Sequence, residues 1–123
     1  MNIVVLRGRL SSGPAVRELQ SGSVLVSLEV TTPDGSGGRS SAPVAWFDPP
    51  RSSSVANWSE GEEVVVLGSV RRRFYRAGGG TQSRTEVVAT NVVRASSTRS
   101  ADRVLAEAVK CLGAEVAGEL PSG

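Results

Sequence analysis

Alternation of apolar and polar residues predicts five β-strands along the chain. Most of these segments are rich in valine and other β-branched residues, and in the second one Val24, Val26, Leu28 and Val30 fall on one face. Turns rich in glycine, proline and serine separate the segments. The predicted strands span residues 3–10, 24–31, 41–47, 64–76 and 84–93.

Four residues refine this pattern. Gly8 predicts a bulge or bend in the first strand, and Gly68 would let the long fourth strand curl. Pro43 has no N–H to donate, so its end of the third strand should lie at an edge or a bulge. Residues 51–58 predict one short helix, which Trp58 should anchor.

The predicted order is therefore β-β-β-α-β-β. Five short strands with one helix between the third and fourth match an OB-fold, a small Greek-key barrel whose exposed face and hairpin loops commonly hold oligonucleotides. We therefore expect an all-β, five-stranded OB-fold barrel over residues 1–97.

From Ser100 the apolar residues recur at three- and four-residue steps, which predicts a C-terminal amphipathic helix within residues 98–123. Ser100 is the expected N-cap and Gly118 the expected stop. We expect the helix to pack on its own barrel, with a role in joining subunits as the alternative. Its apolar stripe comprises Val104, Leu105, Ala108, Cys111, Leu112 and Val116.

Composition narrows the range of functions. A chain of 123 residues fits one domain, and it has neither an apolar run of about 18 residues nor a cationic lead at its start, so we expect a cytoplasmic protein without membrane contact. The single cysteine, Cys111, is expected to be a buried thiol. Because histidine is absent, the common catalytic and zinc-binding arrangements are excluded, and we expect no enzyme, metal or cofactor.

Thirteen of the fourteen basic residues are arginine, whose rigid fork of donors suits phosphate. A GC-rich genome would also favour arginine, so the spacing of the arginines is more informative than their number. Residues 71–76 read Arg-Arg-Arg-Phe-Tyr-Arg and are followed by a glycine-rich tip at residues 77–80. On a strand, each face of this hairpin would offer cations beside an aromatic ring. One face would carry Arg71, Arg73 and Tyr75, and the other Arg72, Phe74 and Arg76.

Three ordered stretches of the barrel carry a further signal. They are Met1-Asn2 with Val4, Leu6, Gly8, Arg9 and Leu10; residues 13–17 with the turn Ser21-Gly22; and residues 85–92, which read Thr-Glu-Val-Val-Ala-Thr-Asn-Val. In this order and spacing they resemble the bacterial single-stranded DNA-binding protein (SSB) family over residues 1–94. The resemblance implies a homotetramer, or a dimer of dimers, that wraps single-stranded DNA in replication, recombination and repair.

The resemblance also assigns site residues. Phe47 and Tyr75 stand at positions where the family stacks bases, and Arg17, Arg71 and Arg73 at positions that are basic in the family. The face that contains Arg71, Arg73 and Tyr75 is preferred, whereas Phe47 is equally well read as core and Trp46 is expected in the core. The candidate DNA-binding residues are Arg17, Phe47, Arg71, Arg73, Phe74, Tyr75 and Arg76.

Two departures from the family change the expectation. Ser41 and Pro43 replace a stacking and a basic position, and the hairpin at residues 33–38 lacks the tryptophan that members often carry there. We therefore expect binding that is weaker and more sensitive to salt than that of a housekeeping member. The chain also lacks the acidic, hydrophobic tip that recruits repair enzymes, which suggests a specialised paralogue without a recruiting tail.

Two other functions remain open at this stage. The main alternative is an OB-fold module for protein interaction or assembly that has lost most of its affinity for DNA, which the missing aromatic residues favour. Binding of RNA is the other, because contacts to phosphates and stacked bases do not exclude ribose.

Overall fold

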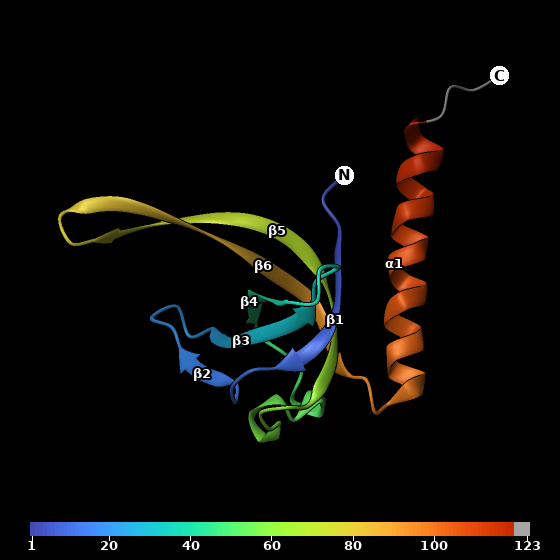
Figure 1. Cartoon of the computed structure of the whole chain (residues 1–123), viewed down its shortest axis with the longest axis horizontal. Coiled ribbons are helices and arrows are strands. Elements are labelled where there is room, and N and C mark those ends of the chain that lie inside the picture. Colours follow the sequence, from blue (N-terminus) through green and yellow to red (C-terminus); the bar gives the residue numbers. More distant parts are fainter. Residues whose placement is uncertain (120–123) are drawn as a thin grey trace.

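The computed structural model describes the backbone of residues 1–119 and the side chains of residues 1–112. Figure 1 shows a barrel from which one long hairpin projects, with a helix standing beside the barrel on the opposite side. The elements are β1 (Val4–Leu10), β2 (Ala15–Glu18), β3 (Val24–Pro33), β4 (Arg39–Phe47), the 3-10 turns η1 (Arg51–Ser53) and η2 (Val55–Asn57), β5 (Glu63–Ala77), β6 (Gly80–Arg94) and α1 (Thr98–Glu119).

Five strands close the barrel in the order β1-β5-β6-β4-β3, and β1 completes the circle by pairing with β3. All these pairs are antiparallel except β4 with β6. The short β2 adds to the outer edge of β3. A closed five-stranded barrel followed by a C-terminal helix is consistent with an OB-fold and confirms the expected fold class.

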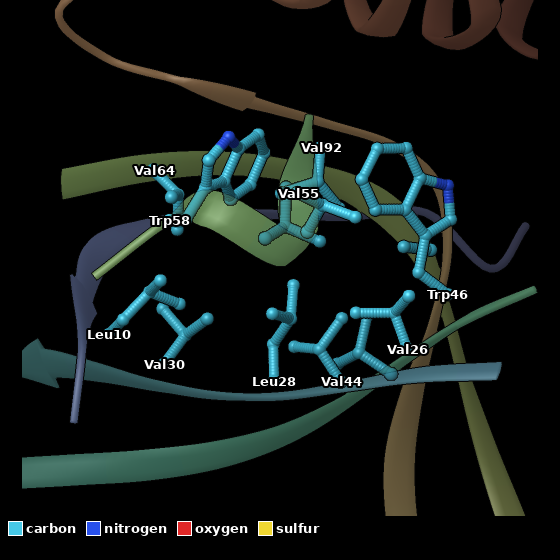
Figure 2. Packing of buried hydrophobic residues seen from close by; sticks show 13 residues of the cluster. Leu10, Val26, Leu28, Val30, Val44, Trp46, Val55, Trp58, Val64 and Val92 are labelled. Carbon is cyan, nitrogen blue, oxygen red and sulfur yellow. The ribbon is translucent and has the colours of Figure 1, made fainter. Parts of the chain in front are cut away.

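The barrel core is built from the inward-facing residues of the five strands together with η2 (Figure 2). Trp46 and Trp58 face each other with ring centroids 6.3 Å apart, and both are buried as expected. The Trp58 indole Nε1 donates to the Ser53 carbonyl at 3.0 Å, so this ring fixes the segment before β5. The buried residues are Leu10, Val26, Leu28, Val30, Val44, Trp46, Val55, Trp58, Val64, Val66, Val87, Ala89 and Val92.

The two glycines singled out in the strands act differently. At Gly68, a bulge shifts the register between Leu67 and Gly68, as expected for a curling strand. A Cβ there would collide with the Val88 carbonyl oxygen. At Gly8 there is no bulge, one of the two predicted possibilities: the register of β1 with β5 is continuous, and glycine is needed because the Thr31 carbonyl oxygen of β3 closes onto β1 at this point.

Other local predictions also needed correction. The expected internal helix is two 3-10 turns, because Ser54 between them is left-handed, with φ of 52°. The third and fifth strands begin earlier than predicted, at Arg39 and Gly80, and β2 was not predicted as a strand. The expectation for Pro43 is confirmed, since β4 has only β3 beside it at this residue and begins to pair with β6 at Val44.

Helix α1 packs on its own barrel through its N-terminal half. Ala101, Val104 and Ala108 are buried against Val65 and Leu67 on the outside of β5. This arrangement confirms the expected packing on the barrel.

The two ends of α1 differ from the predicted ones. The helix begins at Thr98, and Gly118 lies inside it instead of ending it. The Ala101 amide donates to the Ser97 carbonyl, so the helical hydrogen bonds start before Ser100.

The apolar stripe of α1 is only partly covered by the barrel. Leu105, Val109 and Leu112 are exposed, whereas the side chain of Val116 lies outside the described residues. Cys111 is exposed, so the prediction of a buried thiol was wrong: it continues the line of Ala101, Val104 and Ala108 by one turn, beyond the last helical residue that is buried against the barrel. The described residues contain no helix that could serve as a membrane span.

Candidate nucleic-acid interface

The first part of the interface is a row of side chains across β2, β3 and β4. Arg17 lies opposite Leu25, and Leu25 lies opposite Phe47, so the three side chains share one face. Val26 and Trp46, the next residues along, point into the core, which places this row on the outside of the barrel. Leu25 is buried in the middle of the row, while Phe47 keeps 41% of its surface exposed. Phe47 is therefore a surface ring and not a core residue.

The second part of the interface is the outer half of the β5–β6 hairpin, residues 71–86, called the arm from here on. It is a two-stranded ribbon that projects from the barrel (Figure 1). A tight turn closes it, in which Gly78 and Gly79 adopt positive φ values of 58° and 85° that suit glycine. No third strand pairs with the arm in the described part of the chain, and residues 71–76 and 80–85 are all exposed, so both of its faces are open.

Strand register decides which residues of the arm continue the outer face of the barrel. Val70 lies opposite the core residue Val87, so Arg72, Phe74 and Arg76 continue the inward-facing side. Arg71, Arg73 and Tyr75 therefore lie on the outer face, together with Arg17 and Phe47. Phe74 is 66% exposed, which makes it the most exposed aromatic ring on the arm.

The two parts of the outer face are far apart. Val88 of β6 lies beside Ala45 of β4. Phe47 comes two residues after Ala45 on β4. Gln82, which pairs with Tyr75, comes six residues before Val88 on β6. Eight residues of strand therefore separate Phe47 from Tyr75 along the strand direction, which is about 26 Å. A ligand that touches both rings must be long and must follow the strands.

Charges along this path are mixed. Arg73 lies 3.9 Å from the Glu86 carboxylate, and Arg84 lies 3.8 Å from the Glu29 carboxylate. Within the described residues, Arg17 and Arg71 make no ion pair, so both remain available to an anion.

Between its two ends the outer face has no aromatic ring. Thr31 and Ser41 face each other there and their hydroxyl oxygens are 2.9 Å apart, and Pro43 follows on the same face of β4. The predicted loss of the central stacking and basic positions thus leaves a polar stretch without a stacking ring between Phe47 and the arm.

Sequence reasoning missed three residues of this face: Arg84, Glu29 and Glu86. Arg84 lies directly opposite Arg73, which makes it as much a part of the arm as the arginines of β5. Strand alternation puts Glu29 and Glu86 on the outer face, because each directly neighbours a core residue, but only the pairing of β3, β4 and β6 brings them to the same region.

The β3–β4 hairpin tip is ordered by one carboxylate. Asp34 Oδ1 accepts hydrogen bonds from the Ser36 hydroxyl at 2.8 Å, the Ser36 amide at 2.9 Å and the Gly38 amide at 2.9 Å. These bonds, led by that from the Ser36 hydroxyl, lower the pKa of Asp34 because they stabilise the ionised carboxylate. The tip is therefore a shaped polar loop without an aromatic ring.

No protein-family model matches the chain, and no curated protein shows significant similarity to it. In the described part of the chain, His, Cys, Asp and Glu side chains form no cluster of three or more that could hold a metal ion. The interface is thus defined by its arginines, its aromatic rings and the strands that carry them.

Proposed function

We propose that the protein is a non-enzymatic member of the SSB family that binds single-stranded DNA largely irrespective of sequence, in replication, recombination or repair. The observation that carries the proposal is the outer face, on which Arg17 and Phe47 at one end line up with Arg71, Arg73 and Tyr75 at the other. A flexible polyanion with flat bases fits a long, narrow surface of cations and rings.

Each kind of side chain has its own task in this proposal. Arg17 and Arg71 contact phosphates, which releases counterions and makes affinity depend on salt. Phe47 and Tyr75 stack on bases, and because every base has a flat face, stacking tolerates any sequence. The separation of about 26 Å between the rings requires several nucleotides to engage both. Phe74 and Arg76, on the other face of the arm, would hold the strand where it wraps around the ribbon.

The proposal includes assembly into a homo-oligomer, a tetramer or a dimer of dimers, in the cytoplasm. One edge of β1 supports it: residues 4–8 pair with β5 on one side, and β3 reaches β1 only at Arg9 and Leu10. Val5 on this strand is also 41% exposed. A second copy that pairs along this edge would satisfy its free backbone groups. Light scattering after size exclusion would give the mass of the assembly.

The outer face also supports a second candidate, an OB-fold assembly module with little affinity for DNA. Glu29 and Glu86 lie beside Arg84 and Arg73, so two of the arginines on this face already have a carboxylate partner. Such a module would bind proteins through the same surface and would not respond to nucleic acid.

Fluorescence-anisotropy titration of a labelled oligo-dT with wild type and with the Arg73→Ala Tyr75→Ala double variant separates the two candidates. We expect salt-dependent binding by wild type and at least about tenfold weaker binding by the variant, because one stack and one positive charge of the outer face are lost. A matched control is Arg99→Ala Val109→Ala, which removes one cation and one exposed apolar side chain from α1. Competition with an RNA oligomer of the same sequence tests the preference for DNA.

The proposal would be wrong if wild type did not bind at low salt, and the assembly module would then be the better description. Equal loss of affinity in the double variant and in the α1 control would mean that the arm does not carry the interface.

A further inference from the structure

The outer face contains a pocket at the base of the arm, midway along the path between Phe47 and Tyr75. Its volume is about 220 Å³. A space of this size can admit one flat ring system. Four charged side chains from three strands meet there: Glu29 of β3, Arg73 of β5, and Arg84 and Glu86 of β6. Pro43 and Ala45 of β4 lie between them.

The charges of this pocket are balanced. Two guanidinium groups face two carboxylates, so an incoming phosphate meets as much repulsion as attraction. Phosphates are better accommodated at Arg17 and Arg71, which have no carboxylate partner among the described residues. The pocket instead suits a neutral group that both donates and accepts hydrogen bonds.

The hydrogen-bonding groups of the pocket are still free to bind such a group. The Arg73–Glu86 and Arg84–Glu29 distances, 3.9 and 3.8 Å, are longer than hydrogen bonds, so neither pair uses up its donors and acceptors. Arg73 and Arg84 are half-exposed, and the Glu86 side chain is only 13% exposed, so its carboxylate has lost much of its water. A donor that reaches Glu86 therefore replaces lost hydration and is worth more than it would be in solution.

We propose that this pocket reads one guanine base of the bound strand, an inference that rests on the proposed function. Guanine offers O6 and N7 as acceptors to an arginine fork and N1–H with N2–H₂ as adjacent donors to a carboxylate. Thymine has two carbonyl oxygens but a single N–H, so it cannot satisfy both charged partners at once. The pocket adds a preference at one position to binding that elsewhere tolerates any sequence.

The test compares oligo-dT of about twelve nucleotides, a length that one OB-fold can hold, with the same oligomer carrying one central dG, dA or dC. Wild type should bind the dG oligomer about tenfold more tightly than oligo-dT, as one bidentate base contact allows. In Glu29→Gln Glu86→Gln the dG oligomer should bind no more tightly than oligo-dT, because an amide oxygen cannot accept both adjacent donors as a carboxylate does. The matched control, Glu60→Gln Glu107→Gln, removes the same charge from distant exposed positions and should keep the ratio of the two affinities.

Each other outcome is decisive. Tight binding by wild type without preference for dG would overturn the base-reading pocket and leave the proposed function intact. The pocket variant could instead bind all oligomers more tightly and keep the preference for dG. The carboxylates would then act only by repelling the DNA backbone, and the base-reading pocket would be overturned too. If wild type bound no oligomer at all, the proposed function itself would fail, and the inference with it. Because the ratio is measured within one variant, partial loss of folding does not change it.

Discussion

The barrel and the arm are made from the same two strands, yet their chemistry is opposite. In β5, Val64, Val65 and Val66 are fully buried, whereas every residue of that strand from Val70 to Arg76 is exposed. The change occurs at the bulge beside Gly68. Burial of apolar area stabilises the first half, and the second half can carry cations and rings because nothing packs on it. Stability and binding should therefore respond to different mutations along one strand.

The largest effect expected from this comparison is on the barrel side. Trp46→Ala would leave a large cavity against Trp58 and lower the free energy of unfolding by about 3–5 kcal/mol. Its neighbour Phe47 is the matched control, because Phe47→Ala alters the outer face and should leave stability within about 0.5 kcal/mol. Urea unfolding of both variants measures the difference. If both variants were equally destabilised, the outer face of β4 would contribute as much to stability as its core face.

The junction between the barrel and the arm, at Gly68, should not tolerate a larger side chain. Gly68→Ala would place a Cβ against the Val88 carbonyl oxygen, and we expect a loss of about 1–3 kcal/mol and a redirected arm with weaker binding of oligo-dT. Gly80→Ala is the control at the other end of the arm, where a Cβ meets nothing within 4 Å. Urea unfolding gives the stability and anisotropy the affinity. Stability and binding of Gly68→Ala equal to those of wild type would contradict the role given to this residue.

On the arm side, single rings should affect binding and not stability. Tyr75→Ala should weaken binding of oligo-dT by about 1–2 kcal/mol through the loss of one stack, with the unfolding midpoint unchanged. Phe74→Ala removes a more exposed ring from the other face and should cost less. Anisotropy titration of both variants at one salt concentration ranks the two faces. If Phe74→Ala lost more affinity for oligo-dT than Tyr75→Ala, the other face of the arm would be the main binding face.

The smallest effect concerns the β3–β4 hairpin tip. Hydrogen bonds from Ser36 and Gly38 lower the pKa of Asp34, so they stabilise the hairpin tip fully above the pKa of the unfolded chain, about 3.9. This contribution is lost as the pH falls through the lowered pKa of the folded state. Asp34→Ala should speed amide exchange at Ser36 and Gly38 at neutral pH, measured by NMR, and leave oligo-dT binding unchanged. Unchanged exchange would mean that the turn backbone alone orders the tip.

The sequence was sufficient for the fold because the core residues of the strands alternate strictly. Val24, Val26, Leu28 and Val30 predicted β3, and glycine and proline marked most of the turns correctly. The short β2 could not be recognised, since all four of its residues are exposed and no apolar face marks it. The internal helix was predicted from composition alone, which does not reveal the left-handed Ser54 that breaks it.

The candidate site was predictable within single strands but not between them. Alternation correctly divided Arg71, Arg73 and Tyr75 from Arg72, Phe74 and Arg76. The register between strands, which no local pattern specifies, places Phe47 beside Leu25 and Arg17 and brings Glu29 and Glu86 to the arm base. Cys111 was misjudged for the same reason, since only the angle at which α1 meets β5 decides which helical positions are covered.

The open ribbon of the arm has a consequence for solubility. A two-stranded hairpin leaves backbone donors and acceptors along both long edges, and such edges readily recruit a strand from another molecule. Four of the six residues 71–76 are arginines, and Arg84 adds a fifth charge across the ribbon. Two arms that approached edge to edge would bring these charges together, and the repulsion would keep them apart. The same guanidinium groups therefore also protect the protein from aggregating through its most exposed backbone.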